Sequence, residues 1–169
     1  MAKISKIIAL TALIILAFGM TAIDNAVADE ATNEAIVQRN VEEIWHKVNV
    51  GIADEIVAAN YVRHLPGGKE IRGREAYKKF VTGYMTAFPD MRWNIDIMIS
   101  KRDYVAVLLS GSGTHTGPGM GPPTGKKVTD TSIIIYHLAG GKMVEDWLMY
   151  DTLGFMQQLG YQLVPPGGE

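Results

Sequence analysis

The stretch KMVEDWLMYDTLGFMQQLG, residues 142–160, decides the fold because a strand pattern runs directly into a helix pattern there. Strand-forming residues fill its first half, and alternation places Trp147, Met149 and Asp151 on one face together with Glu145. In its second half apolar side chains recur every third residue, a helical stripe that ends at a glycine. The stretch therefore predicts a last strand followed by a short helix.

Asp151 lies at the joint between these two patterns, and its carboxylate has two interpretations. The first is an N-cap, which accepts a hydrogen bond from the first free amides of the helix. The second is a general acid/base at the rim or floor of an apolar pocket, where burial of a carboxyl group allows it to exchange protons near neutral pH. The local sequence favours the cap, and both interpretations stay open at this point.

The first 28 residues have the composition of an export signal. Two lysines precede an almost unbroken apolar run over residues 7–17, and Ala26-Val27-Ala28 has the small-x-small pattern of a cleavage site. The alternative is a membrane anchor, but polar residues and a glycine interrupt the run before the ~20 apolar residues that a span requires. We predict a signal peptide (1–28) cleaved after Ala28, a periplasmic or secreted domain (29–163) and a flexible tail (164–169).

The overall composition limits the possible functions. The formal net charge is −2 with scattered Lys and Arg, so the chain has no basic footprint for nucleic acid or, once the leader is removed, for an anionic membrane. It contains no Cys, which excludes disulfides, thiol catalysis and zinc-thiolate sites. With 169 residues it can form one domain with a substantial core.

Periodicity along the rest of the chain predicts helices first and strands later. We expect helices over residues 31–50, 52–61 and 73–88, with a brief strand over 62–65. Strands follow over 92–99, 104–115 and 128–138. Glycines in the second of these predict a bulge or a sharp bend, and a Gly/Pro loop over 116–127 separates it from the third.

This order predicts an α+β domain in which N-terminal helices pack on a curved, mostly antiparallel sheet. A sheet wrapped around the helix over residues 73–88 forms a cone with an apolar interior, a natural pocket for a small hydrophobic ligand. We assign Tyr84 and Trp93, on the apolar faces of this helix and the next strand, to that pocket, together with His64.

Five short motifs follow one another along the chain: Ala87-Phe88-Pro89-Asp90, Gly113-Thr114-His115-Thr116-Gly117, Pro123-Thr124-Gly125-Lys126, Gly141-Lys142 and Glu145-x-Trp147-x-x-x-Asp151. In this order they resemble the SnoaL-like polyketide (ester) cyclases, a family of the wider NTF2-like group. The resemblance covers residues 41–160, nearly the whole predicted domain. It indicates the family more strongly than the reaction, since one fold hosts many chemistries.

The resemblance implies a cone-shaped barrel that closes a polyketide ring by intramolecular aldol condensation, without a metal or an organic cofactor. It implies that Asp151 is the general acid/base, and His137 on the preceding strand is the best match for its partner. His64 and His115 fall near the cavity in the family pattern, and we interpret Trp147 as a cavity wall. Relatives pair through the outer face of the sheet, which implies a homodimer or a higher homo-oligomer.

The expected chemistry is modest. Forming an enolate beside carbonyl groups needs one base and one hydrogen-bond donor, and holding both ends of a flexible substrate together removes much of the barrier, up to ~7–11 kcal/mol. One positioned acid/base adds roughly 10²–10⁴ in rate. An Asp with a His neighbour in an apolar cone would therefore suffice.

Two classes of function remain open on the sequence. One is a cofactor-independent lyase or isomerase on a hydrophobic carbonyl compound, which the retained Asp151 and His115 favour. The other is a periplasmic domain that binds a ligand without chemistry; the export leader favours it, as does Asp146, expected at the rim where many relatives carry His. A metal hydrolase is disfavoured because the four His residues are far apart and form no His-x-x-x-His pair.

Overall fold

The structure, a computed structural model, describes residues 29–164. None of the helices in this range is long and apolar enough to cross a membrane. The predicted signal peptide and residues 165–169 of the predicted tail lie outside the described residues.

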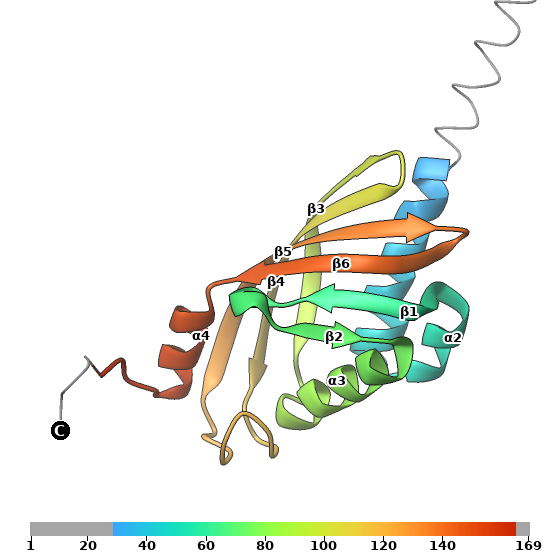
Figure 1. The fold of residues 1–169 in the computed structure, drawn as a ribbon. Coiled ribbons are helices and arrows are strands. Elements are labelled where there is room, and N and C mark those ends of the chain that lie inside the picture. Colours follow the sequence, from blue (N-terminus) through green and yellow to red (C-terminus); the bar gives the residue numbers. More distant parts are fainter. Residues whose placement is uncertain (1–28, 165–169) are drawn as a thin grey trace, which may run out of the picture.

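Helices are grouped in the first half of the domain and long strands in the second (Figure 1). Residues 29–39 form an α-helix that continues as the π-helix η1 (Asn40–His46). The elements that follow are η2 (Val50–Ile52), α2 (Ala53–Ile56), β1 (Val57–His64), η3 (Pro66–Gly68), β2 (Glu70–Arg72), α3 (Arg74–Ala87), β3 (Arg92–Lys101), β4 (Tyr104–Thr114), β5 (Lys127–Ala139), β6 (Lys142–Tyr150) and α4 (Thr152–Leu159).

The strands form one six-stranded sheet in the order β2-β1-β6-β5-β4-β3. All neighbouring pairs are antiparallel except β1 and β6, which run parallel. Figure 1 shows α3 beside the sheet and α4 leaving the end of β6. The predicted α+β class, with helices packed on a mostly antiparallel sheet and a short helix at the end, is confirmed.

The core lies between α3 and the face of the sheet turned toward it, which we call the inner face. From α3, Tyr77, Val81 and Met85 are buried at the spacing of one helix face. The inner face of β4 and β5 supplies the residues Val105, Val107, Leu109, Ile134, Tyr136 and Leu138. The stripe predicted over residues 73–88 is therefore core, as expected, and Pro89 follows it.

The prediction of a second helix over residues 52–61 is wrong in its second half. Helix α2 ends at Ile56, and β1 begins at Val57, well before the brief strand expected over 62–65. Residues Val62 to His64 pair with β6 on one side and β2 on the other, and Val57 pairs with Met143 of β6. These long-range bonds outweigh the local helical spacing. Besides the four strands of the predicted antiparallel meander, the sheet thus contains a β1 longer than the brief strand expected and a strand, β2, that was not predicted.

The glycines of β4 do not mark a bulge, one of the two alternatives predicted for them. β4 pairs with β5 along its whole length without a register shift, and the irregularity lies in β3 between Ile95 and Ile97. The glycines instead allow a close approach, because a Cβ atom on Gly111 would lie 2.6 Å from the indole ring of Trp93. The first helix also ends earlier than predicted, at His46.

Candidate active site

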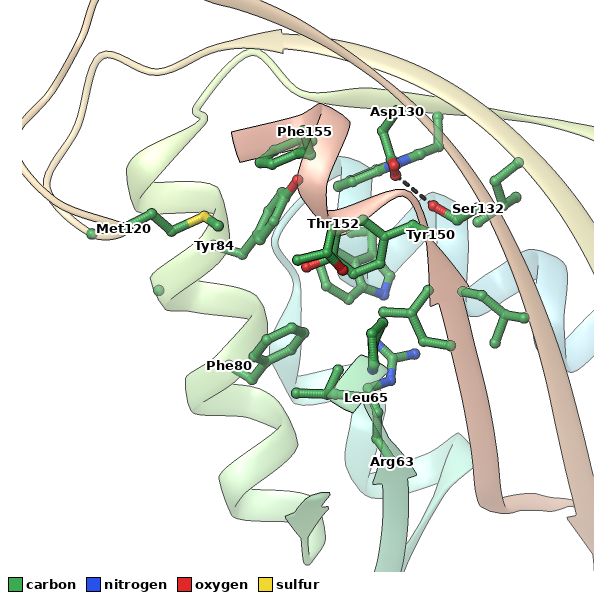
Figure 2. Close-up of a pocket in the computed structure, with 18 of the residues that line it drawn as sticks. Arg63, Leu65, Phe80, Tyr84, Met120, Asp130, Ser132, Tyr150, Thr152 and Phe155 are labelled. Carbon is green, nitrogen blue, oxygen red and sulfur yellow. Dashed lines mark hydrogen bonds between the residues drawn. The ribbon is translucent and has the colours of Figure 1, made fainter. Parts of the chain in front are cut away.

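A cavity of about 650 Å³ lies between α3 and the inner face of the sheet (Figure 2). This volume is within the range of small-molecule sites, roughly 300–1,000 Å³. Its lining is mainly apolar and aromatic, and its charged residues are Arg63, Lys69, Lys79 and Asp130. The cavity is therefore the first candidate for a ligand site.

Aromatic rings from three elements form one wall of the cavity. Trp45 of η1 meets Trp93 of β3 edge to face with ring centroids 5.3 Å apart, and it meets Tyr84 of α3 in the same way at 5.9 Å. Edge-to-face pairs of this kind hold rings in fixed orientations. Tyr84 and Trp93, both predicted as pocket residues, are thus in the lining, and the π-helix η1 adds Trp45 to them.

Asp130 on β5 is the only carboxylate among the residues that line the cavity. Its Oδ2 accepts a hydrogen bond from the Ser132 hydroxyl and one from the Trp93 indole N–H, at 3.3 Å. Figure 2 shows Asp130 and Ser132 next to each other on the sheet side of the cavity. The two donors fix the orientation of the carboxylate while it lies beside an apolar space.

Tyr84 provides a neutral donor in the same cavity. Burial raises the pKa of its phenol well above the ordinary value, and the carboxylate of Asp130 and the nearby Tyr150 raise it further. The hydroxyl therefore stays protonated at neutral pH. It forms no hydrogen bond within residues 29–164, so it can donate one to a ligand oxygen.

Arg63 and Asp146 form a buried ion pair behind the floor of the cavity. Arg63 Nη2 lies 2.6 Å from Asp146 Oδ2, Nε lies 3.0 Å from both carboxylate oxygens, and the Tyr61 hydroxyl donates to the same carboxylate. Their side chains are 1% and 0% exposed. The prediction that Asp146 lies at the rim is therefore wrong. Its side chain lies on the inner face of β6 and is buried.

Aromatic rings surround the Arg63 guanidinium on its other sides. Its Cζ lies 5.1 Å from the centroid of Tyr77 and 5.6 Å from that of Trp45, distances typical of cation–π contacts. Trp45 Nε1 donates to the Tyr77 hydroxyl at 2.9 Å, and this hydroxyl donates to Asn40 Oδ1 at 2.6 Å. The charge is fully satisfied within the protein, which gives the cavity a rigid and nearly neutral floor.

Asp151 lies outside the lining of this cavity. Its exposed side chain accepts a hydrogen bond from the Gly154 N–H at 2.9 Å, and α4 ends at Gly160 with a φ of 100°. The N-cap interpretation is confirmed. The acid/base role implied by the resemblance stays a prediction, and no contact described here supports it.

His64, His137 and Trp147 lie on the opposite face of the sheet, which we call the outer face. The His64 ring stacks on Trp147 at 5.3 Å, and its Nε2 lies 2.7 Å from a Glu145 carboxylate oxygen. His137 stacks on Tyr104 at 4.7 Å, with its Nδ1 4.0 Å from the same Glu145 carboxylate. None of these side chains is in the lining of the cavity.

Alternation explains why these predicted residues lie together but away from the cavity. Glu145, Trp147 and Met149 do share one face of β6, as the sequence indicates, but Leu148 and Tyr150, of the other parity, line the cavity. The same rule places His137 opposite the pocket-lining residues of β5. The structure thus brings His137 next to Glu145 rather than next to Asp151.

His115 is buried and organises the loop after β4. Its Nε2 donates to the Gly119 carbonyl at 2.8 Å, its Nδ1 accepts from the Thr124 N–H at 3.3 Å, and its ring stacks on Phe88. The loop residues Pro118, Gly119 and Met120 line the cavity, whereas His115 itself does not. His115 therefore positions a wall of the pocket.

Asp130 and Arg63 are polar residues of the cavity that the sequence analysis did not single out. The signal for Asp130 was present, since Asp130, Ser132, Ile134 and Tyr136 share one parity of β5 and all four line the cavity. Arg63 falls in the brief strand predicted over residues 62–65, but no pattern there indicated which of its side chains face the cavity. Within residues 29–164, no three His, Asp or Glu side chains are grouped so that they could hold a metal ion.

Comparisons with known proteins agree with this geometry. The profile of the SnoaL-like polyketide cyclase family matches residues 35–159. A polyketide cyclase-type protein from Acidithiobacillus ferrooxidans is 28% identical, with a TM-score of 0.67 over 76% of this chain and 94% of that one. A SnoaL-like cyclase-type protein from Jannaschia sp. CCS1 has a TM-score of 0.74 at 22% identity, over 80% and 96% of the two chains.

The same fold also occurs under a different functional label. AclR from Streptomyces galilaeus, described as a hydroxylase, has a TM-score of 0.69 at 24% identity, over 81% of this chain and 87% of its own. No curated protein sequence matches this chain.

The sheet, the helices on its inner face and the cavity between them define an NTF2-like α+β domain. The chain belongs to the SnoaL-like polyketide cyclase family. This membership and its cyclase-type structural neighbours support an enzyme of the cyclase or isomerase type.

Proposed function

We propose that this protein is a cofactor-independent acid/base enzyme that acts on a small hydrophobic carbonyl compound inside the cavity. The observation that carries the proposal is Asp130, a single carboxylate oriented by Ser132 and Trp93 within a mainly apolar and aromatic lining. A base in such a position can remove a proton from a carbon next to a carbonyl group.

The proton balance of an aldol-type step is simple in this arrangement. The Asp130 carboxylate takes a proton from the carbon, the enolate carbon bonds to a second carbonyl carbon of the same substrate, and the protonated Asp130 returns the proton to the new alkoxide. The Tyr84 hydroxyl, kept neutral by its raised pKa, can donate a hydrogen bond to the enolate oxygen. The rigid aromatic wall would hold the flexible substrate with its ends together.

Exchange of deuterium into ketone substrates tests the proposal. The purified protein is incubated in D₂O with a set of hydrophobic ketones whose α-protons exchange slowly in buffer alone, and incorporation is followed by NMR. We expect exchange by the wild type and a loss of roughly 10²–10⁴-fold in Asp130→Asn, which keeps the shape of the side chain but cannot act as the base. Exchange that is unchanged in Asp130→Asn would refute this role.

A second candidate function is ligand binding without chemistry. It is favoured by the position of Asp151, because the carboxylate that the resemblance makes catalytic is exposed and caps α4 instead. Equal binding of a hydrophobic ketone by the wild type and Asp130→Asn, without exchange in either, would support this function.

Export is part of the proposal and rests on the sequence of the first 28 residues. Cleavage after Ala28 would release a domain that begins at Asp29, the first residue of the helix over 29–39. N-terminal sequencing of the protein from a periplasmic or culture fraction tests this, and an N-terminus at Met1 would refute it.

A further inference from the structure

Two lysines without ionic partners lie in the lining of the cavity. Lys69 follows η3, and Lys79 lies on α3 directly before the lining residue Phe80. In the described part of the chain neither side chain forms an ion pair, whereas the neighbouring Lys78 pairs with Asp54 and Glu75. An unpaired cation in a ligand cavity is available to a charge on the ligand.

The other charges of the lining do not neutralise these lysines. Arg63 is already compensated by Asp146, and Asp130 is the only acid among the lining residues. With Asp146 included, three cations face two anions, so the cavity has an excess of one positive charge. This excess lies at the end that carries the lysines.

The lysines and Asp130 belong to different ends of the cavity. The Lys69 carbonyl accepts a hydrogen bond from the Leu65 N–H at 2.8 Å, and Lys79 is adjacent to Phe80. Figure 2 shows Leu65 and Phe80 toward one end of the cavity and Asp130 with Phe155 toward the other. Between the two ends lie the aromatic rings of the lining.

We propose that the ligand carries a carboxylate that Lys69 and Lys79 recognise, joined by an apolar body to the carbonyl group that faces Asp130. This inference rests on the proposed function for the position of the carbonyl group only. Because Leu65 and Phe80, the neighbours of the two lysines, lie toward the other end of the cavity from Asp130, the carboxylate of the ligand is placed away from the Asp130 carboxylate. The substrate class is then a hydrophobic oxo-carboxylic acid rather than a neutral ester or ketone.

A matched pair of ligands tests this assignment. Quenching of tryptophan fluorescence, which Trp45 and Trp93 in the lining make sensitive to occupancy, gives the affinities of 5-oxodecanoic acid and its methyl ester at low salt. We expect the acid to bind roughly 3- to 10-fold more tightly, since exposed ion pairs contribute modestly. The preference should shrink in 0.5 M salt and disappear in the double variant Lys69→Gln/Lys79→Gln.

The control variants separate this proposal from the proposed function. Lys78→Gln removes one positive charge from α3 outside the lining and should leave the preference for the acid unchanged. Equal binding of acid and ester by the wild type, or a preference that survives in the double variant, would overturn the inference. A preference for the acid without proton exchange would support it while contradicting the catalytic proposal.

Discussion

The buried ion pair between Arg63 and Asp146 makes a strong prediction for stability. Asp146→Asn keeps the shape of the side chain but leaves the Arg63 cation buried at 1% exposure without a countercharge. Removing one partner of a buried pair typically costs about 3–5 kcal/mol. For a urea m-value of about 2 kcal/mol/M, the unfolding midpoint should fall by roughly 1.5–2.5 M.

Two further variants show whether the loss comes from the uncompensated charge. Glu145→Gln removes a carboxylate from the adjacent position of β6, where it is half exposed on the outer face, and should cost less than about 1 kcal/mol. The double variant Arg63→Met/Asp146→Leu removes both charges and should be more stable than Asp146→Asn. Urea titrations followed by circular dichroism measure all three. The reasoning fails if Asp146→Asn is as stable as Glu145→Gln, or if the double variant is less stable than Asp146→Asn.

Three other predictions concern the cap, the outer face and pH. Asp151→Ala should lose about 0.5–2 kcal/mol of unfolding free energy, whereas Asp151→Asn should keep most of this stability because Asn also caps helices well. If a stable Asp151→Asn variant lost α-proton exchange, that result would restore the catalytic role that the resemblance implies. Ile135 is 42% exposed among other apolar side chains of the outer face, and we expect this face to form the contact of a homodimer. Ile135→Lys should therefore give a monomer when its mass is measured by light scattering, and a monomeric wild type would contradict the expected dimer. Burial and the charge of Arg92 lower the pKa of His46, whose Nε2 accepts from the Trp93 N–H. The neutral form of His46 is therefore preferred in the folded state, and the free energy of unfolding should fall as pH drops below 6.5. The slope of this free energy against pH should be smaller in His46→Gln, and equal slopes in the variant and the wild type would refute the prediction.

The fold could be predicted from the sequence wherever one face of an element is clearly apolar. Helices α3 and α4 have this property, strands β3 to β6 were predicted from their runs of strand-forming residues, and the order of these elements gives the α+β class. Only the end of strand β1 was predicted, as the brief strand over residues 62–65, because the rest of β1 is defined by partners far along the chain. Its register pairs Val62 with Glu145 of β6, a contact that no local pattern contains.

The candidate site was harder to predict because the alternation of strand side chains separates the two faces of the sheet without indicating which face α3 covers. On β5, Asp130 and Ser132 belong to one parity, and His137 belongs to the other. The outer parity also carries Ile133 and Ile135, so hydrophobicity could not decide between the faces. Choosing the parity with the histidine leads to the outer face, whereas the position of α3 in the structure identifies the inner one.

The GTHTG motif, whose His115 the resemblance placed near the cavity, attaches the loop after β4 to helix α3. The N–H groups of Thr116 and Gly117 both donate to the Ala87 carbonyl at 3.1 Å, and a Cβ atom on Gly117 would lie 1.8 Å from the Thr86 carbonyl oxygen. Together with the contacts of His115, these bonds attach the loop to the end of α3. In this chain the motif holds the pocket wall in place, and the residues that line the cavity are Pro118, Gly119 and Met120 of the loop that follows it.

The parallel pairing of β1 with β6 has a consequence for how the chain is synthesised. A ribosome would release β1 long before β6, yet the sheet order places the late strand between β1 and β5. A nascent chain that stops before Lys142 would have two separate pieces of sheet with unpaired edges and no closed floor for the cavity. The domain should therefore reach its native form only after almost the whole polypeptide has emerged.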